Sequence, residues 1–144
     1  MCEEVKSNSD LSSFVQQKID EFEQLLLNEP QIECPVQHFF TPGLYTRQIL
    51  IPRGTFLTSK IHKTQHPFII SVGKITVFTE TEGEQLLEAP YMGITQPHTR
   101  RVLYAHEDTV WTTFHATDKT TVEEVEEEII IKREHFKSIE GGIS

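Results

Sequence analysis

Residues 60–73 of the chain read KIHKTQHPFIISVG, two histidines four positions apart followed by an apolar segment that ends at a glycine. Four-residue spacing places two side chains on one face of a helix, but it also lets them face the same way on two strands joined by a tight turn. β-Branched Ile and Thr disfavour a helix here, and Pro67 restricts the preceding His66 to extended backbone. We therefore predict a strand that ends near His62, a short connection, and a second strand that begins at His66.

The same pattern continues on both sides of this stretch. Between residues 36 and 117, short segments rich in Val, Ile, Thr, Phe and Tyr alternate with turns that contain Pro or Gly. No helical periodicity interrupts them, which argues against alternating strands and helices. An all-β sandwich, jelly roll or barrel is expected, with strands near residues 44–51, 54–62, 66–72, 74–80, 85–88, 91–95, 100–105 and 109–116.

The alternation of side chains along a strand predicts which residues share a face. Positions 56, 58, 60 and 62 fall on one face of their strand, and positions 66, 68, 70 and 72 fall on one face of the next. On the last expected strand, Trp111, Thr113 and His115 alternate onto one face. This face can point into the interior of a barrel.

Residues 10–28, DLSSFVQQKIDEFEQLLLN, predict an amphipathic helix. Ser9 or Asp10 can cap its start, and Pro30 prevents its continuation. The apolar stripe of this helix must be buried against the barrel or against a second subunit. Because a barrel already covers its own interior, we expect a homo-oligomer. Its apolar residues recur at steps of three and four: Leu11, Phe14, Val15, Ile19, Phe22, Leu25 and Leu26.

A second helix is predicted in the acidic segment VEEVEEEIIIKREHF at 122–136. Glutamates near its start and Lys132 and Arg133 near its end complement the helix dipole. The three isoleucines at 129–131 are equally compatible with a strand. The chain is thereby divided into an N-terminal tail and helix at 1–33, a barrel at 34–119, and an acidic helix and tail at 120–144.

Composition excludes several classes of function. The chain has 144 residues, of which 37% are hydrophobic and 24% charged, as in a single soluble globular domain. A formal net charge of −9 without a basic stripe argues against nucleic-acid binding. No apolar run approaches the roughly 20 residues that span a bilayer, and MCEEVKSNSD lacks the apolar core of a signal peptide. Cys2 and Cys34 are too few for a disulfide scaffold, so a cytoplasmic protein with no membrane partner is expected.

Two segments resemble the two conserved motifs of the cupin superfamily: GTFLTSKIHKTQHPFIISVGKITVF at 54–78 and EAPYMGITQPHTRRVLYAHEDTVWTTFHA at 88–116. The first motif has the general form G-x5-H-x-H-x3,4-E-x6-G. Counted back from Gly73, its glutamate position falls on His66 and its second histidine on His62. Its first histidine position is occupied by Lys60.

The second motif, P-x-G-x2-H, aligns with residues 96–101 and places His98 at its glycine and Arg101 at its histidine. More narrowly, HKTxH together with HEDTVWTTFHATD at 106–118 is similar to small cupin-like proteins of tailed bacteriophages. The resemblance spans residues 40–116 and implies a cupin-like jelly-roll barrel between the two helices. A phage-encoded protein of this kind would act in the host cytoplasm or in the virion.

The resemblance also implies a metal site inside the barrel. Divalent iron, manganese, nickel or zinc accepts neutral imidazole ligands, and two of the motif positions hold His62 and His66. The third ligand would be His115 on a strand or His98 in a loop. We favour His115, because a strand holds its residues more rigidly than a loop does.

Two further motif positions carry cations. Lys60 and Arg101 in one pocket would repel a divalent metal and attract a small anionic molecule, with His98 beside them. An alternative interpretation is that the histidines only donate and accept hydrogen bonds in a polar interior. The sequence thus supports two hypotheses. The first is a metal-binding cupin that acts on a small anionic molecule, with the metal as Lewis acid or oxygen-activating centre, or with a histidine as general base without metal. The second is a non-catalytic phage-type structural or assembly protein.

Overall fold

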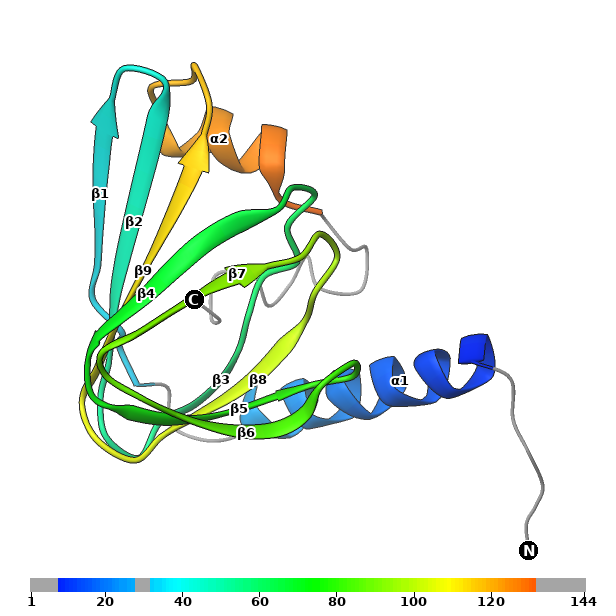
Figure 1. Ribbon diagram of the computed structural model, residues 1–144. Coiled ribbons are helices and arrows are strands. Elements are labelled where there is room, and N and C mark those ends of the chain that lie inside the picture. Colours follow the sequence, from blue (N-terminus) through cyan, green and yellow to red (C-terminus); the bar gives the residue numbers. More distant parts are fainter. Residues whose placement is uncertain (1–7, 28–31, 132–144) are drawn as a thin grey trace, which may run out of the picture.

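Two antiparallel sheets face each other in the computed structural model, which describes residues 8–27 and 32–131 (Figure 1). The first sheet contains, in spatial order, β1 (Val36–Thr41), β2 (Leu44–Ile51), β9 (Thr109–Ala116), β4 (His66–Val72) and β7 (Tyr91–Thr95). The second contains β3 (Phe56–Thr58), β8 (Arg101–Ala105), β5 (Lys74–Thr79) and β6 (Gly83–Glu88). Strands distant in sequence, such as β2 and β9, are neighbours in space, and the predicted all-β jelly roll is confirmed.

The strand β1 is absent from the sequence-based prediction. Its residues VQHFFT lack a clear alternation of polar and apolar side chains, and most of them are exposed. Pairing with β2 from Val36 opposite Ile49 to Thr41 opposite Leu44 nevertheless forms a hairpin. Gly43 supplies the φ of 75° that this tight turn requires. The strand therefore depends on its partner more than on its own sequence.

The predicted strand over 54–62 is confirmed only for Phe56–Thr58. Phe56 faces the outside of the barrel, whereas Lys60 and His62 line its interior. The four positions therefore do not share one face, because irregular backbone after β3 breaks the alternation. His62 is held instead by an isolated antiparallel bridge to Ile130.

The hydrophobic core lies between the two sheets. The rings of Phe68 and Trp111 stack in it with their centroids 4.5 Å apart. On β4 the predicted alternation holds as far as Ile70, but a β-bulge then leaves Val72 exposed, contrary to the prediction. Burial of each large apolar side chain contributes about 1.5–3 kcal/mol. The buried cluster consists of Ile49, Ile51, Leu57, Phe68, Ile70, Ile75, Val77, Leu87, Leu103, Ala105 and Trp111.

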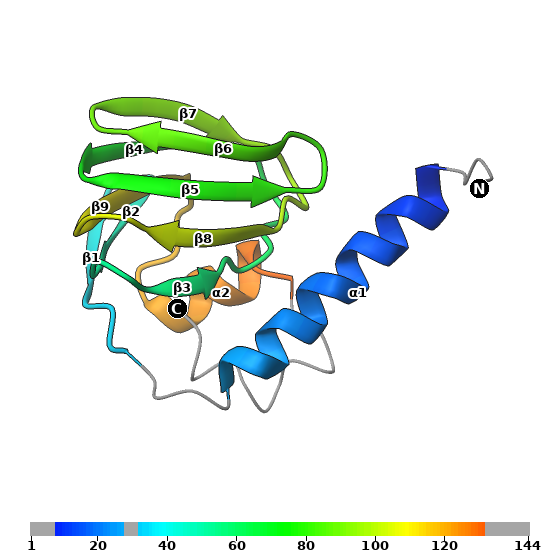
Figure 2. The same ribbon diagram turned by 90° about the horizontal axis from the view of Figure 1, so that it is seen from below.

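Helix α1 (Asn8–Leu27) lies against β3 on the outside of the barrel and extends beyond its edge (Figure 2). Ile19 is buried, and the ring of Phe22 packs edge-on against Phe56 with centroids 5.5 Å apart. Of the two predicted ways to cover the apolar stripe, packing on the barrel is present for these residues. Elsewhere in the stripe, Phe14 and Leu25 are exposed, and the side chains of Leu11 and Leu26 lie outside the described residues.

A buried ion pair fastens α1 to the barrel. The side chain of Arg100 is 1% exposed and contacts the carboxylates of Glu23 and Asp20, each at 2.7 Å. Thr58 of β3 donates a hydrogen bond to the same Glu23. Loss of either partner would leave a charge buried without compensation. The position of α1 therefore depends on Arg100 and Glu23 together.

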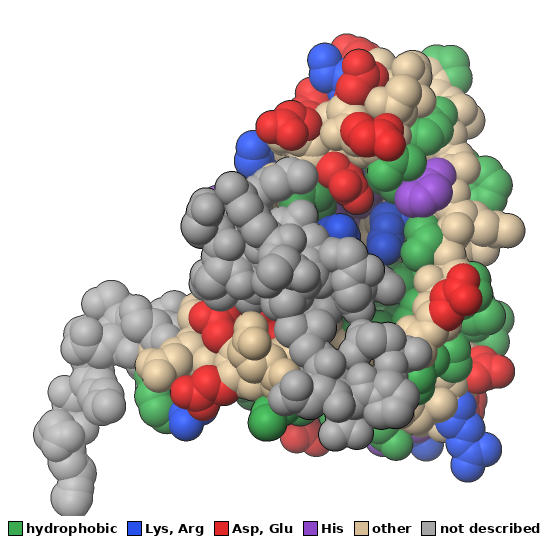
Figure 3. All heavy atoms as spheres, turned by 180° about the vertical axis from the view of Figure 1, so that it is seen from behind, with side chains coloured by type: hydrophobic (Ala, Val, Ile, Leu, Met, Phe, Trp, Pro, Cys, Tyr) green, Lys and Arg blue, Asp and Glu red, His purple; other side chains and the backbone are tan. Residues whose placement is uncertain are grey.

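Helix α2 (Val122–Ile129) covers one end of the barrel, and its glutamates gather on the surface there (Figure 3). The Thr121 side chain caps the helix by accepting a hydrogen bond from the backbone N–H of Glu124 at 3.2 Å. After Ile129 the chain is extended, and Ile131 N donates to the Ile61 carbonyl at 2.8 Å. The predicted helix therefore ends at Ile129, and Ile130 forms an isolated bridge to His62 rather than a strand.

Some predictions concern residues that the structure does not describe. Cys2 and the tail at 132–144, with Lys132 and Arg133, lie outside the described residues. Within the described part of the chain, no helix is both long and apolar enough to cross a membrane.

Candidate metal centre

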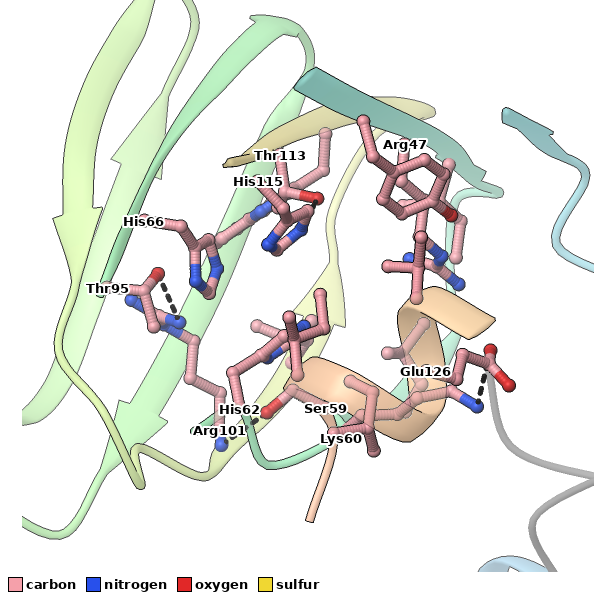
Figure 4. A pocket seen from close by; sticks show the side chains of 18 of the residues that line it. Arg47, Ser59, Lys60, His62, His66, Thr95, Arg101, Thr113, His115 and Glu126 are labelled. Atoms are coloured by element: carbon pink, nitrogen blue, oxygen red, sulfur yellow. Dashed lines mark hydrogen bonds and ion pairs between the residues drawn. The ribbon is translucent and has the colours of Figure 1, made fainter. Parts of the chain in front are cut away.

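Three histidine side chains converge inside the barrel, in the pocket that α2 also lines (Figure 4). His66 begins β4, His115 lies near the end of β9, and His62 lies in the connection between β3 and β4. Their ring centroids are 4.5 Å (62–66), 5.1 Å (62–115) and 4.4 Å (66–115) apart. Each ring offers one nitrogen as a possible ligand, and these three nitrogens all lie within 4.8 Å of one another. Among the described residues, no other group of His, Cys, Asp or Glu has this arrangement.

Local contacts orient two of the rings. Nδ1 of His66 lies 3.2 Å from the Thr64 carbonyl, which only an N–H can satisfy, so Nε2 keeps its lone pair. Nε2 of His115 lies 2.9 Å from Oγ1 of Thr113. Its other nitrogen, Nδ1, is buried without a hydrogen-bond partner. An unsatisfied buried nitrogen costs about 1–3 kcal/mol, a cost that a bound metal ion would remove.

The surroundings keep the imidazoles neutral. Burial, with smaller contributions from His66, His115 and two arginines, lowers the pKa of His62 to about 2. Burial, followed by the proximity of His66 and Arg47, lowers the pKa of His115 to about 3. Burial also lowers the pKa of His66. Neutral imidazole is the form that binds a divalent metal.

The histidines line a pocket of about 80 Å³, which the predicted cations Lys60 and Arg101 also line. Arg101 Nη1 donates a hydrogen bond to Oγ1 of Thr95 at 3.0 Å. The guanidinium of Arg101 also lies over the stacked rings of Phe68 and Trp111, 5.1 and 5.6 Å from their centroids. Lys60 Nζ lies 3.7 Å from a carboxylate oxygen of Glu126 on α2.

No protein-family model and no curated protein matches this sequence. Solved structures do share its architecture. An ectoine synthase from P. lautus is 14% identical, with a TM-score of 0.55 over 68% of this chain and 75% of that one. A cupin 2 domain-containing protein from Halorhodospira halophila is 16% identical, with a TM-score of 0.52 over 65% and 70%. An RmlC-like cupin family protein from Methanocaldococcus jannaschii is 13% identical, with a TM-score of 0.50 over 60% and 82%.

The chain has the cupin fold. Identities this low establish the fold of the barrel alone, so the chemistry must be argued from the residues of this pocket. In this cupin barrel, Lys60 and Arg101 stand where the resemblance places two histidines of the motifs. His115 comes from β9, which follows the residues 96–101 aligned with the second motif, and it lies with His62 and His66.

Arg47 also lines the pocket of the cupin barrel, although no sequence motif points to it. It lies on β2, where Tyr45, Arg47, Ile49 and Ile51 alternate toward the interior. Burial lowers the pKa of Arg47, and no carboxylate among the described residues forms an ion pair with it. The signal that could have identified it is one arginine at an inward-facing position among apolar residues.

His98 lies apart from the histidine cluster. It is exposed in the connection between β7 and β8, has a φ of 68°, and lines a separate groove beside the β5–β6 turn. Its backbone N–H donates to the His62 carbonyl at 2.8 Å, so the loop supports the cluster through its main chain. Of the two alternatives for a third histidine, the structure brings His115 to the other two.

Proposed function

We propose that this cupin barrel binds one divalent transition-metal ion through His62, His66 and His115, and that it holds a small anionic molecule beside the ion through Lys60 and Arg101. The observation that carries the proposal is the convergence of three neutral imidazoles with nitrogens within 4.8 Å of one another. The buried, unpartnered Nδ1 of His115 supports it further.

The donor set fits such an ion. Imidazole nitrogen suits iron, nickel and zinc, with manganese as the fourth candidate. Three protein ligands leave coordination positions for a small molecule, as catalytic metal sites require. Thr113 and the carbonyl of Thr64 contact the ring nitrogens of His115 and His66, in the way that outer partners hold metal-binding histidines. A bound ion would supply Lewis-acid polarisation of a ligand oxygen.

Lys60 and Arg101 account for the charge of the ligand. Two cations and a metal ion in one pocket repel one another, and an anion between them relieves that repulsion. Arg101 donates one side-chain N–H to Thr95, and its other N–H groups can donate to a carboxylate. Lys60 and Arg101 are therefore compatible with a bound metal ion, because the negative charge of the ligand offsets the repulsion between the cations and the metal. The hypothesis that the protein is an enzyme depends on this same site.

A second candidate is a non-catalytic structural or assembly role, in line with the resemblance to tailed-phage proteins. Exposed apolar side chains on α1 and on the edge strands β6 and β7 favour it, since such surfaces suit contacts between subunits: Leu25, Leu86, Met92 and Ile94. The polar pocket favours the first candidate, because a purely structural barrel would fill that space with packed side chains. A homo-oligomer and a cytoplasmic location stay predictions in both cases.

Metal content tests the proposal. The protein, purified without a polyhistidine tag and reconstituted with iron, manganese, nickel or zinc, should hold near-stoichiometric metal by inductively coupled plasma mass spectrometry. The His62→Ala, His66→Ala double variant should lose the metal while keeping its circular dichroism spectrum. His98→Asn changes an exposed histidine outside the cluster and should keep it. A parent protein that takes up none of the four metals would overturn the proposal.

A further inference from the structure

We propose that the anionic molecule is a short dicarboxylate, held with one carboxylate on Arg47 and the other on Arg101, on opposite sides of the histidine cluster. This inference rests on the proposed function, since it needs a ligand in the pocket. It adds Arg47 as a binding residue and a second anionic group to the ligand.

The order of strands places the two arginines on opposite sides. Across the first sheet, β2, β9, β4 and β7 are consecutive neighbours, and they carry Arg47, His115, His66 and Thr95 in that order. Arg101 reaches this row at its far end, where it donates to Thr95. Neighbouring strands are about 4.8 Å apart, so roughly 14 Å separates the backbones of β2 and β7. Figure 4 shows Arg47 and Arg101 at opposite ends of the pocket, with the histidines between them.

Register fixes the same arrangement along the strands. Arg47 lies directly opposite Thr113, and Tyr45 lies opposite His115. His66 lies opposite Thr95 on the other side of the cluster. Each arginine is therefore tied to one flank of the cluster, and a single small anionic group beside one of them would leave the other without a partner.

The charges in the pocket call for two anionic groups. Three cations line it, and Glu126 is the acidic residue among its lining residues, with Lys60 at 3.7 Å. Within the described ranges, neither Arg47 nor Arg101 forms an ion pair with a carboxylate. The whole chain carries a net charge of −9, yet among the described residues Glu126 alone brings a carboxylate to this pocket. Burying a guanidinium without an anion is costly, and a dianion compensates both.

The geometry of guanidinium selects carboxylate at each end. Its planar, forked N–H groups match the two oxygens of a carboxylate. Arg47 makes no side-chain hydrogen bond with another described residue, and Arg101 donates to Thr95 alone among side chains. The pocket of about 80 Å³ restricts the spacer between the carboxylates to a few carbon atoms. Malonate, succinate and glutarate are therefore the probes of choice.

Isothermal titration calorimetry on the metal-loaded full chain tests the inference. One of the three dicarboxylates should bind about tenfold or more tightly than propionate or butyrate, because it gains a second charge-assisted contact. It should also bind more tightly than inorganic phosphate, which carries comparable charge but cannot span the two arginines. Equal binding of dicarboxylate and monocarboxylate, or preference for phosphate, would overturn the inference.

Variants locate the two contacts. Arg47→Gln and Arg101→Gln should each abolish the preference for the dicarboxylate, whereas Arg53→Gln, a change at an exposed arginine, should leave it intact. Arg47→Lys keeps the charge but loses the fork, and it should bind the dicarboxylate more weakly than the parent. If Arg47→Gln behaves like Arg53→Gln while circular dichroism shows both folded, Arg47 is not a ligand-binding residue and the inference fails.

Failure of this inference and failure of the metal proposal give different results. Metal content is measured on the same samples, and the titrations are repeated after chelation, because the arginine contacts do not need the metal. A metal-loaded protein without dicarboxylate preference overturns the dianion inference alone. A protein that prefers dicarboxylate but takes up no metal overturns the metal proposal alone.

Discussion

His62 and His115 stack ring on ring, with centroids 5.1 Å apart and ring planes 11° from parallel. One residue comes from the irregular connection after β3 and the other from β9, so the contact exists only in the folded barrel. Two imidazoles at this distance tolerate each other while they are neutral, since two protonated rings would repel. The state of charge of this pair therefore links the stability of the barrel to the site inside it.

Acid should weaken the metal-free protein. Burial lowers the pKa of His62 to about 2 and of His115 to about 3, below the ordinary histidine value of 6.5. Between those values the unfolded chain binds more protons than the folded chain, so the free energy of unfolding falls as the pH drops below 6.5. Above 6.5 these two groups should add no pH dependence.

Urea denaturation of chelator-treated protein at about pH 7.5 and about pH 5 measures this effect. His62→Gln removes one of the two titrating groups and should reduce the loss of stability on acidification. A variant that loses as much stability as the parent would show that the folded barrel does not keep His62 neutral.

Thr113 should control metal affinity without contacting the ion. Its Oγ1 lies 2.9 Å from Nε2 of His115 and orients that ring. Thr113→Val removes the hydroxyl at nearly constant volume and should weaken metal binding about 10–100-fold. Competition with a chromophoric chelator gives the affinity. The matched control is Thr112→Val, whose hydroxyl accepts from Gln48 at 3.1 Å; comparable losses in the two variants would contradict a specific role for Thr113.

Arg100 should be essential for the attachment of α1. Arg100→Met leaves Glu23 buried without its cation and should cost about 3–5 kcal/mol of stability. Adding Glu23→Leu removes the stranded charge and should recover part of that loss. A double-mutant cycle from urea denaturation gives the coupling energy. Additive effects would mean that the two residues do not depend on each other.

The inward and outward faces of β4 and β7 predict a large difference in stability between variants of two isoleucines. Ile70 is 0% exposed and Ile94, on the neighbouring strand β7, is 59% exposed. Ile70→Ala should therefore cost about 2–5 kcal/mol through the cavity it leaves, while Ile94→Ala should stay within about 0.5 kcal/mol. Thermal or urea unfolding of the two variants measures the difference. Similar losses would contradict the assignment of inward and outward faces.

Much of the barrel follows from sequence because its turns are marked by Pro and Gly and its strands by β-branched residues. The strands from β4 to β9 lie within a few residues of their predicted bounds. His115 follows from the alternation on β9, which Trp111 and Thr113 share. Regular strands thus let sequence place a side chain on the interior face.

Where the backbone is irregular, the sequence no longer shows which side chains face the interior. The strand β3 ends at Thr58, and the positions of Lys60 and His62 then depend on the bridge to Ile130. That contact joins segments far apart in sequence, which local alternation cannot reveal. Arg47 is missed for a different reason. An arginine on a predicted strand is expected at the surface, and only the neighbouring strands show which face of β2 points inward.

X-ray absorption spectroscopy of the zinc-loaded protein tests the three-histidine site most directly. The parent protein should show three imidazole nitrogens at about 2.0–2.1 Å from the metal. His115→Ala should reduce this to two, while His98→Asn should leave the spectrum unchanged. A spectrum without imidazole scattering, or one that His115→Ala does not alter, would contradict a metal centre built from His62, His66 and His115.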